Sequence, residues 1–402
     1  MSWPMVKLGS VGEFKAGFGF PIEYQGKKEG DYPFAKVGDI SAIVRGGHKN
    51  ISHAGNYIDK DILVDLKAKT IPKGTIVFAK IGEAIKQNFR AITTVEMVID
   101  NNVMGLVPDN NLVDTNYLFY FMRSLDLYQF SGATTIPALR KSMLENIQIP
   151  LPPLSEQKRI AAIFDKADGI CQKRQKAIKL ADDFLRATFL EMFGDPVTNP
   201  KGFDTRLLSD FFIDDKNGTK CGPFGSALKK DEYTREGVPV WNMDNITLQG
   251  DFIDSPSLWI SEDKYRELNS YSVSDGDVII SRAGTVGKMG VVRSNSPKSI
   301  ISTNLIRVRF SEKLYPEYFV SLMTYCKGRV GNLKTGPDGA FTHMNTGVLS
   351  NLEFPYPPLE LQRKYNHIRQ NVMSLIYKYN NYGHKIDETF YAINQKAFLG
   401  KP

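Results

Sequence analysis

The sequence predicts a mixed α/β (α+β) fold in which two similar globular domains are joined by two long antiparallel helices that pair as a coiled coil. Two observations predict it. A seven-residue apolar period continues for about forty residues in each of two separate segments. Five landmarks of the first half of the chain also recur in the same order in the second half. Together they indicate a duplicated unit of one domain followed by one helix, with pseudo-twofold symmetry.

Length and composition agree with this organisation. A chain of 402 residues is too long for one ordinary hydrophobic core. The proportions of hydrophobic residues (42%) and charged residues (24%) are those of a soluble globular protein. No apolar run is long enough to span a membrane and the N-terminus lacks a signal-peptide core, so we expect a cytoplasmic protein without a membrane partner.

The first long helix is predicted within residues 151–195. Prolines in the segment 150–153 keep the approach extended, and Ser155 follows as an N-cap. Gly194 and Pro196 end the helix. The apolar seam of this helix is Phe164, Cys171, Ile178, Leu185 and Met192.

The second long helix is predicted within residues 356–402, after a divergent copy of the proline-rich approach. Its seam is Tyr365, Val372, Tyr379, Ile386 and Ile393. The two seams are equally long and equally placed, which predicts that the helices pack on each other. The alternative is two unrelated surface helices, each packed on its own core.

The domains that precede the helices are predicted at residues 1–150 and 196–355. In the first domain we expect a turn, a strand and a second turn over 73–82, another strand at 101–107 and a short helix at 116–125. The landmarks shared with the second domain are residues 32–40 with 238–246, 74–82 with 276–284, Asn102 with Asn304, Tyr117 with Tyr318, and Leu154 with Leu359. Landmarks that keep their order and spacing indicate a duplication.

Motifs of catalysis are missing from the sequence. The Gly-rich segment 17–19 does not lead into a long helix, as a phosphate loop requires. The Pro-Pro pairs lack the flanking residues of a DNA-amino methyltransferase loop, and the five histidines have no metal-ligand spacing. We therefore expect no catalytic residue, no metal site and no cofactor in this chain.

Loop residues suit binding better than catalysis. The net charge of +7 permits a polyanionic partner without proving one. Lys, Arg, Asn and Gln side chains follow the ends of predicted strands, and such side chains contact base edges or phosphates of DNA. The predicted DNA-binding residues are Lys36, Lys80, Lys86, Gln87, Asn88 and Arg90 in the first domain, and Lys220, Asn242, Asn245, Arg282, Lys288 and Arg293 in the second. For any single one, the alternative is an ordinary solvated loop residue.

Two further patterns are shared between the domains. The aligned pairs Lys36/Asn242 and Asp39/Asn245 place polar groups at one turn in both copies. The loop 222–226 lies roughly opposite residues 17–19. That loop is either a backbone clamp near DNA or a structural turn.

The central segment carries a family resemblance. The run Pro-Leu-Pro-Pro-Leu-Ser-Glu-Gln-Lys-Arg-Ile from position 150, a long helix, and then Phe-Gly-Asp-Pro from position 193 resemble the specificity subunit of type I restriction-modification enzymes. The resemblance covers essentially the whole chain. It implies two target recognition domains, each reading one half of a bipartite site on double-stranded DNA. Because these domains vary within the family, the resemblance does not identify base-contacting residues.

The same resemblance implies the partners. Two methyltransferase subunits would dock on the helices, and restriction subunits with ATP-driven translocation would join that core. S-adenosylmethionine, ATP and Mg²⁺ would then belong to the partners. The charged outer face of the first helix is the expected docking surface, through Lys158, Arg159, Lys173 and Lys176.

Two other functions remain open from the sequence. One is a coiled-coil scaffold whose domains bind proteins and not DNA. The other is a fused modification enzyme in which this chain is itself catalytic.

Overall fold

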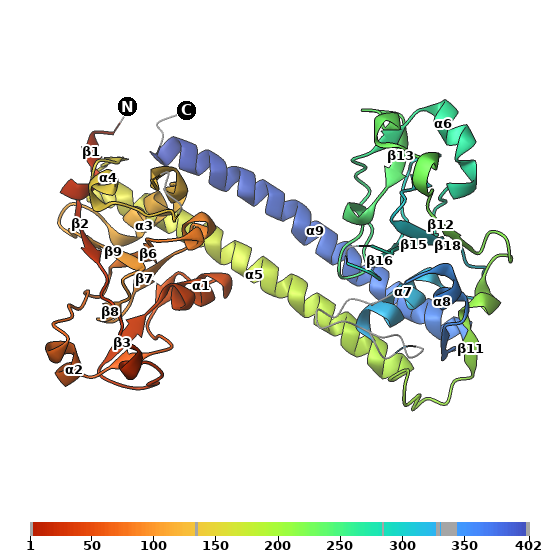
Figure 1. Ribbon diagram of the computed structural model, residues 1–402, viewed down its shortest axis with the longest axis horizontal. Coiled ribbons are helices and arrows are strands. Elements are labelled where there is room, and N and C mark those ends of the chain that lie inside the picture. The colour runs from red at the N-terminus through yellow and green to blue at the C-terminus, as the bar shows by residue number, and fades with distance from the viewer. Residues whose placement is uncertain (1–2, 133–135, 284, 327–329, 331–343, 399–402) are drawn as a thin grey trace. The chain divides into compact units, whose positions relative to one another are not determined.

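The computed structural model describes residues 3–132, 136–283, 285–326, 330 and 344–398 (Figure 1). The chain forms two compact units. Unit 1 comprises residues 1–175 and 380–402, and unit 2 comprises residues 176–379. The long helices α5 (Leu154–Phe193) and α9 (Leu359–Phe398) each contribute one part to each unit.

Unit 1 is built on three small sheets (Figure 1). The largest has the order β2-β9-β6-β7-β4, the second has the order β5-β3-β8, and β1 pairs with β10. The strands are β1 (Met5–Lys7), β2 (Gly12–Ala16), β3 (Tyr32–Ala35), β4 (Asn50–Ile51), β5 (Tyr57–Ile58), β6 (Ile76–Ala79), β7 (Arg90–Thr93), β8 (Val98–Ile99), β9 (Val103–Pro108) and β10 (Gln148–Pro150). The helices are α1 (Val37–Arg45), α2 (Lys60–Asp65), α3 (Thr115–Ser124) and α4 (Lys141–Glu145).

Unit 2 repeats these sheets. The sheet β12-β18-β15-β16 corresponds to β2-β9-β6-β7, the sheet β14-β13-β17 to β5-β3-β8, and the pair β11-β19 to β1-β10. The strands are β11 (Thr205–Leu207), β12 (Thr219–Cys221), β13 (Val238–Trp241), β14 (Trp259–Ile260), β15 (Val278–Ser281), β16 (Met289–Val291), β17 (Ile300–Ile301), β18 (Leu305–Val308) and β19 (Glu353–Pro355). The helices are α6 (Glu262–Glu267), α7 (Pro316–Tyr325) and α8 (Thr346–Ser350). The predicted duplication is confirmed, and of the strands described in unit 1 only β4 lacks a counterpart in unit 2.

Aromatic side chains of both long helices pack in the hydrophobic core of each unit. In unit 1, Phe164 of α5 stacks on Phe398 of α9 with ring centroids 5.6 Å apart. In unit 2, Phe189 of α5 meets Tyr365 of α9 at 5.3 Å. The beginning of each helix thus packs near the end of the other, so the predicted antiparallel arrangement is confirmed.

The apolar seam of α5 is buried most deeply near its ends. Phe164 is 0% exposed and Leu185 is 2% exposed, whereas Ile170 and Phe184 beside the seam are 50% and 52% exposed. Seam residues of α5 therefore pack into the domain cores as well as against α9, as Phe164 does in unit 1. The predicted seam positions Ile386 and Ile393 lie outside the residues whose side chains the structure describes.

Each of the two proline-rich segments is followed by a buried glutamine in the first turn of the long helix. Gln157 is fully buried, accepts a hydrogen bond from the backbone N–H of Asp114 at 2.8 Å, and donates to the Pro152 carbonyl at 2.8 Å. Gln362 is equally buried and binds the Tyr315 N–H at 3.0 Å and the Pro357 carbonyl at 2.9 Å.

The groups that these glutamines hold are equivalent. Asp114 and Tyr315 are the N-cap residues of α3 and α7. Each glutamine thus ties the first turn of a long helix to the start of the domain helix beneath it. Tyr117 and Tyr318 strengthen the same junction by donating their hydroxyls to the carbonyls of Pro150 and Pro355 at 2.8 and 3.0 Å.

Within the part of the chain that the structure describes, none of the helices is long and apolar enough to cross a membrane.

Candidate nucleic-acid interface

Three strand ends meet at one edge of the central sheet in each unit. In unit 1, β2 ends just before Gly17, β6 ends just before Lys80, and the turn at Asn102 precedes β9. The backbone N–H of Lys80 donates to the Asn102 carbonyl at 2.8 Å. In unit 2, the N–H of Arg282 donates to the Asn304 carbonyl at 2.9 Å. We call these two regions the strand-end clusters. Lys80 and Arg282 occupy equivalent backbone positions in them.

A glycine is required at the matching position of each cluster. A Cβ atom on Gly17 would lie 1.9 Å from the carbonyl oxygen of Asp100, and one on Gly222 would lie 1.9 Å from that of Ser302. Two backbones therefore approach each other too closely for any side chain. The correspondence between residues 17–19 and the loop from 222 is confirmed, and in both places the glycine serves a structural turn.

The loop between β6 and β7 holds most of the predicted contacts of unit 1. It contains the 3-10 helix η3 (Glu83–Gln87). Lys86 forms an ion pair with Glu83 at 2.7 Å on the surface. Gln87 accepts a hydrogen bond from Arg45 at 3.2 Å. The loop that follows Lys80 in the sequence therefore carries exposed polar side chains, Lys86 and Gln87.

Arg90 is the first residue of β7, and its side chain is buried beside this loop. Its side chain is 2% exposed and donates to the carbonyl oxygens of Asn88 and Leu125. Asn88, in the left-handed conformation with φ 56°, donates to the same Leu125 carbonyl at 2.9 Å. Burial, together with repulsion from Arg123, lowers the pKa of Arg90 to about 9. Arg90 and Asn88 therefore shape the loop, because their side chains form hydrogen bonds within the domain.

The aligned polar pairs are also structural. In unit 1 the backbone N–H of Lys36 donates to the Asp39 carboxylate at 2.7 Å, and in unit 2 that of Asn242 donates to the Asn245 side chain at 3.0 Å. Asn245 is 1% exposed. The pairing reflects one capping interaction in both copies, although it starts the helix α1 in unit 1 and only the 3-10 helix η8 (Met243–Asn245) in unit 2. The Lys36 ammonium itself lies over the Phe20 ring at 5.3 Å.

The remaining predicted residues of unit 2 are dispersed. The Lys288 ammonium donates to the Met243 carbonyl at 2.8 Å, which connects its loop to η8. Arg293 pairs with Asp275 at 2.7 Å and with Glu317, at the end of the β15–β16 hairpin away from Arg282. Lys220 lies over the ring of Tyr271 at 5.2 Å. Of these, only Lys288 shares the loop of Arg282.

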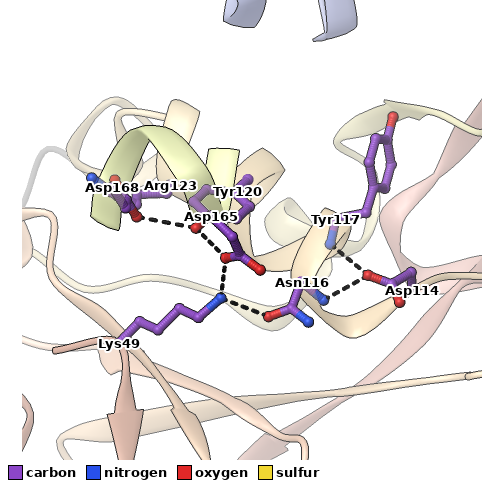
Figure 2. Close-up of polar contacts among 8 residues, drawn as sticks. All are labelled: Lys49, Asp114, Asn116, Tyr117, Tyr120, Arg123, Asp165 and Asp168. Carbon is purple, nitrogen blue, oxygen red and sulfur yellow. Dashed lines mark hydrogen bonds and ion pairs between the residues drawn. The ribbon is translucent and has the colours of Figure 1, made fainter. Parts of the chain in front are cut away.

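A polar network holds α5 against α3 in unit 1 (Figure 2). Lys49 pairs with Asp165 of α5 and donates to Asn116 of α3 at 2.9 Å. The Tyr120 hydroxyl donates to Asp165 at 2.6 Å and to Asp168 at 3.1 Å. Burial and the two carboxylates raise the pKa of Tyr120, so the hydroxyl keeps its proton.

This network borders a cleft of about 490 Å³, whose lining includes Arg45, His48, Gln87, Phe89, Arg123 and Gln172. Sequence reasoning missed the network because Lys49 and Asp165 are 116 residues apart. Two aspartates three residues apart on the helix were the only available signal. Among the residues that the structure describes, no group of His, Cys, Asp and Glu is placed to hold a metal ion.

The four basic residues predicted to contact partner subunits all lie exposed on α5. Arg159 forms a surface ion pair with Glu156 at 2.6 Å. Lys158 is its exposed neighbour, and Lys173 and Lys176 are exposed farther along the helix.

Comparison with known proteins gives a consistent result. The family model described as "Type I restriction modification DNA specificity domain" matches residues 2–180 and again residues 200–380. The type I restriction enzyme MjaVIII specificity subunit of Methanocaldococcus jannaschii is 25% identical over 380 residues, which cover 90% of this chain and 84% of the relative. The type I restriction enzyme StySPI specificity subunit of Salmonella potsdam is 22% identical, and the match covers 94% of this chain and 90% of the relative.

Solved structures share the fold. The S subunit of a type I restriction-modification system from M. genitalium superposes with a TM-score of 0.60 at 17% identity, covering 99% of this chain and 96% of that one. A second solved structure comes from a study of complex assembly and conformational transition of the type I R-M system. It superposes with a TM-score of 0.53 at 21% identity, and the match covers 98% of this chain and 97% of that one.

Proposed function

This chain belongs to the family of type I restriction-modification DNA specificity proteins, and from that premise we propose that each unit reads one half of a bipartite site on double-stranded DNA. The chain is a specificity subunit with two target recognition domains, and it is not one of the catalytic subunits. Because the two units differ in sequence, the two half-sites differ as well. The site is therefore asymmetric.

The observation that supports this proposal most is the equivalence of Lys80 and Arg282. Both cations follow the end of the same strand and make the same backbone hydrogen bond, at 2.8 and 2.9 Å. Two copies of one fold thus place a positive side chain at one matched edge. Positive side chains at an edge next to polar loops are suited to the phosphates and base edges of DNA.

The partners follow from the family and from the exposed face of α5. Two methyltransferase subunits bind the long helices, where Lys158, Arg159, Lys173 and Lys176 are exposed. Restriction and translocation subunits join that assembly. S-adenosylmethionine, ATP and Mg²⁺ are bound by these partners.

DNA binding by the complex with its methyltransferase is expected to weaken steeply with salt. For 6–10 phosphate contacts, affinity falls about 10³- to 10⁵-fold between 50 and 200 mM salt. Lys80→Ala and Arg282→Ala should each weaken binding, and the salt slope should fall by about 1 for every phosphate that a variant no longer neutralises. The measurement is fluorescence anisotropy with a labelled duplex over a salt series.

A matched control is Arg266→Ala, since this exposed arginine forms a local ion pair with Asp263 on the same helix, α6, at 2.7 Å. This variant should bind DNA like the unaltered complex. If the complex shows no salt-sensitive binding, the units are protein-binding modules and the DNA proposal is wrong.

A further inference from the structure

Phe224 is an exposed aromatic residue at the strand-end cluster of unit 2. It follows β12 and precedes the 3-10 helix η6 (Gly225–Ala227), and its side chain is 54% exposed. A single exposed apolar side chain is ordinary on a protein surface, so a role for Phe224 has to be argued from the loop that holds it and from its neighbours.

The loop that carries Phe224 is tightly built. The N–H of Gly222 donates to the Leu305 carbonyl at 2.9 Å, and no Cβ atom would fit at Gly222. After Phe224, Gly225 takes a φ of +55°, and the N–H of Ala227 donates back to the Phe224 carbonyl at 3.0 Å. The backbone on both sides of Phe224 is therefore held in place, and the ring is presented outward by a defined turn.

Arg282 lies over this ring. Its guanidinium carbon is 4.3 Å from the centroid of Phe224, within the range of a cation–π contact. Within the described part of the chain, the guanidinium of Arg282 has no hydrogen-bond acceptor or carboxylate partner. Arg293 and Arg309, in contrast, are paired with Asp275 and Asp277 at 2.7 Å. The donors of Arg282 are thus available to a ligand while one face of its plane is covered.

Unit 1 shows that the fold itself does not demand this arrangement. In the equivalent loop after Gly17, the position that matches Phe224 is Gly19. The aromatic residues on either side of it turn to the core: Phe18 is partly buried, and Phe20 is 9% exposed and stacks on Phe34 with centroids 3.8 Å apart.

The matched cation of unit 1 is Lys80, which has no planar group to stack. Among the described residues, unit 1 has arginine–aromatic contacts elsewhere, such as Arg45 over Phe89 at 5.8 Å. At the strand-end clusters, the exposed pair of an aromatic ring and an arginine belongs to unit 2.

We propose that Phe224 is a positioning residue for DNA specificity in the half-site read by unit 2. Its ring fixes the plane of the Arg282 guanidinium, so that two parallel N–H groups at the guanidinium edge donate to O6 and N7 of one guanine. Arginine makes this bidentate contact because its donors form a rigid fork, whereas a lysine provides a single point charge. This inference rests on the proposed function.

The test compares methyltransferase complexes that carry Phe224→Leu, Phe224→Tyr, Arg282→Lys, or Phe224→Leu combined with Arg282→Lys. Each is titrated with the target duplex, defined by methylation sequencing, and with duplexes changed at single base pairs of the unit 2 half-site. Arg282→Lys should lose about 10- to 100-fold of discrimination at one G·C pair. Phe224→Leu should lose discrimination at that same pair, Phe224→Tyr should retain it, and the double variant should lose no more than Arg282→Lys alone.

Several outcomes would overturn the inference. Phe224→Leu could weaken binding to all duplexes equally, act at a different base pair from Arg282→Lys, or add fully to it in the double variant. Each of these would assign Phe224 a contact of its own and not a positioning role. The absence of salt-sensitive DNA binding by the unaltered complex would instead overturn the proposed function, so the two failures are distinguishable. Thermal unfolding of each variant confirms that unit 2 is folded in every comparison.

Discussion

Replacing Gln157 by leucine is expected to destabilise unit 1 by about 2–5 kcal/mol, because the change leaves buried polar backbone groups without partners. Gln157 accepts from the Asp114 N–H and donates to the carbonyls of Pro152 and Leu112, at 2.8, 2.8 and 3.1 Å. Leucine has a similar volume but no donor or acceptor. The loss therefore falls on hydrogen bonds and not on packing.

The equivalent glutamine of unit 2 provides a matched comparison for this prediction. Gln362→Leu should destabilise unit 2 in the same way, because Gln362 binds the N-cap residue Tyr315 at 3.0 Å. Lys158→Ala, which changes the exposed neighbour of Gln157, should shift stability by no more than about 0.5 kcal/mol.

Hydrogen–deuterium exchange mass spectrometry measures each unit separately within the full chain. Gln157→Leu should reduce protection in the peptides of α3 and the start of α5, and Gln362→Leu in those of α7 and the start of α9. Equal loss of protection in both units from either single variant would show that the junctions are not independent, contrary to this prediction.

Inserting one heptad into both long helices is expected to lengthen the spacer between the half-sites by about three base pairs. Seven helical residues add about 10 Å, and DNA rises about 3.4 Å per base pair. The insertions belong after Gln175 in α5 and after Tyr379 in α9, where the chain passes from one unit to the other. A heptad keeps the seam on the same side of each helix, so the aromatic contacts at both ends are retained.

A heptad in α5 alone is the matched control. It puts the two helices out of register, so that the Phe164–Phe398 and Phe189–Tyr365 contacts cannot both form. We expect loss of methylation from this variant and normal half-sites with a longer spacer from the double insertion. Methylation sequencing that finds altered half-sites with an unaltered spacer would show that the helices do not set the separation.

Much of the architecture could be predicted because it depends on patterns that are local or repeated. The seven-residue period and the flanking prolines placed α5 within residues 151–195, and the structure has it at Leu154–Phe193. The short helix expected at 116–125 is α3, at Thr115–Ser124. The repeated landmarks fall on equivalent strands, such as β3 and β13.

The roles of individual site residues could not be predicted because they depend on partners distant in the sequence. Arg90 looks like an ordinary basic loop residue until the fold brings the Leu125 carbonyl to its guanidinium, at 2.9 Å. Asn245 looks like a base-reading amide, yet it holds a turn in the interior. A polar residue that follows a strand is therefore as suited to shaping a loop as to binding a ligand.

Phe224 is the opposite case, an apolar residue that the fold leaves exposed. Apolar residues in a sequence are expected in the core, and nothing local distinguishes Phe224 from Phe20. Only the positions of the turn at Gly222 and of Arg282 reveal that one ring faces outward while the other is buried.

The central claim is that two different units of one chain read two different halves of one DNA site. Long-read methylome sequencing of cells that carry this chain with its methyltransferase tests it most directly. We predict a bipartite motif of two unlike half-sites, each with a methylated adenine, separated by a spacer of fixed length and free sequence. A continuous motif, or two identical half-sites in inverted order, would contradict the account.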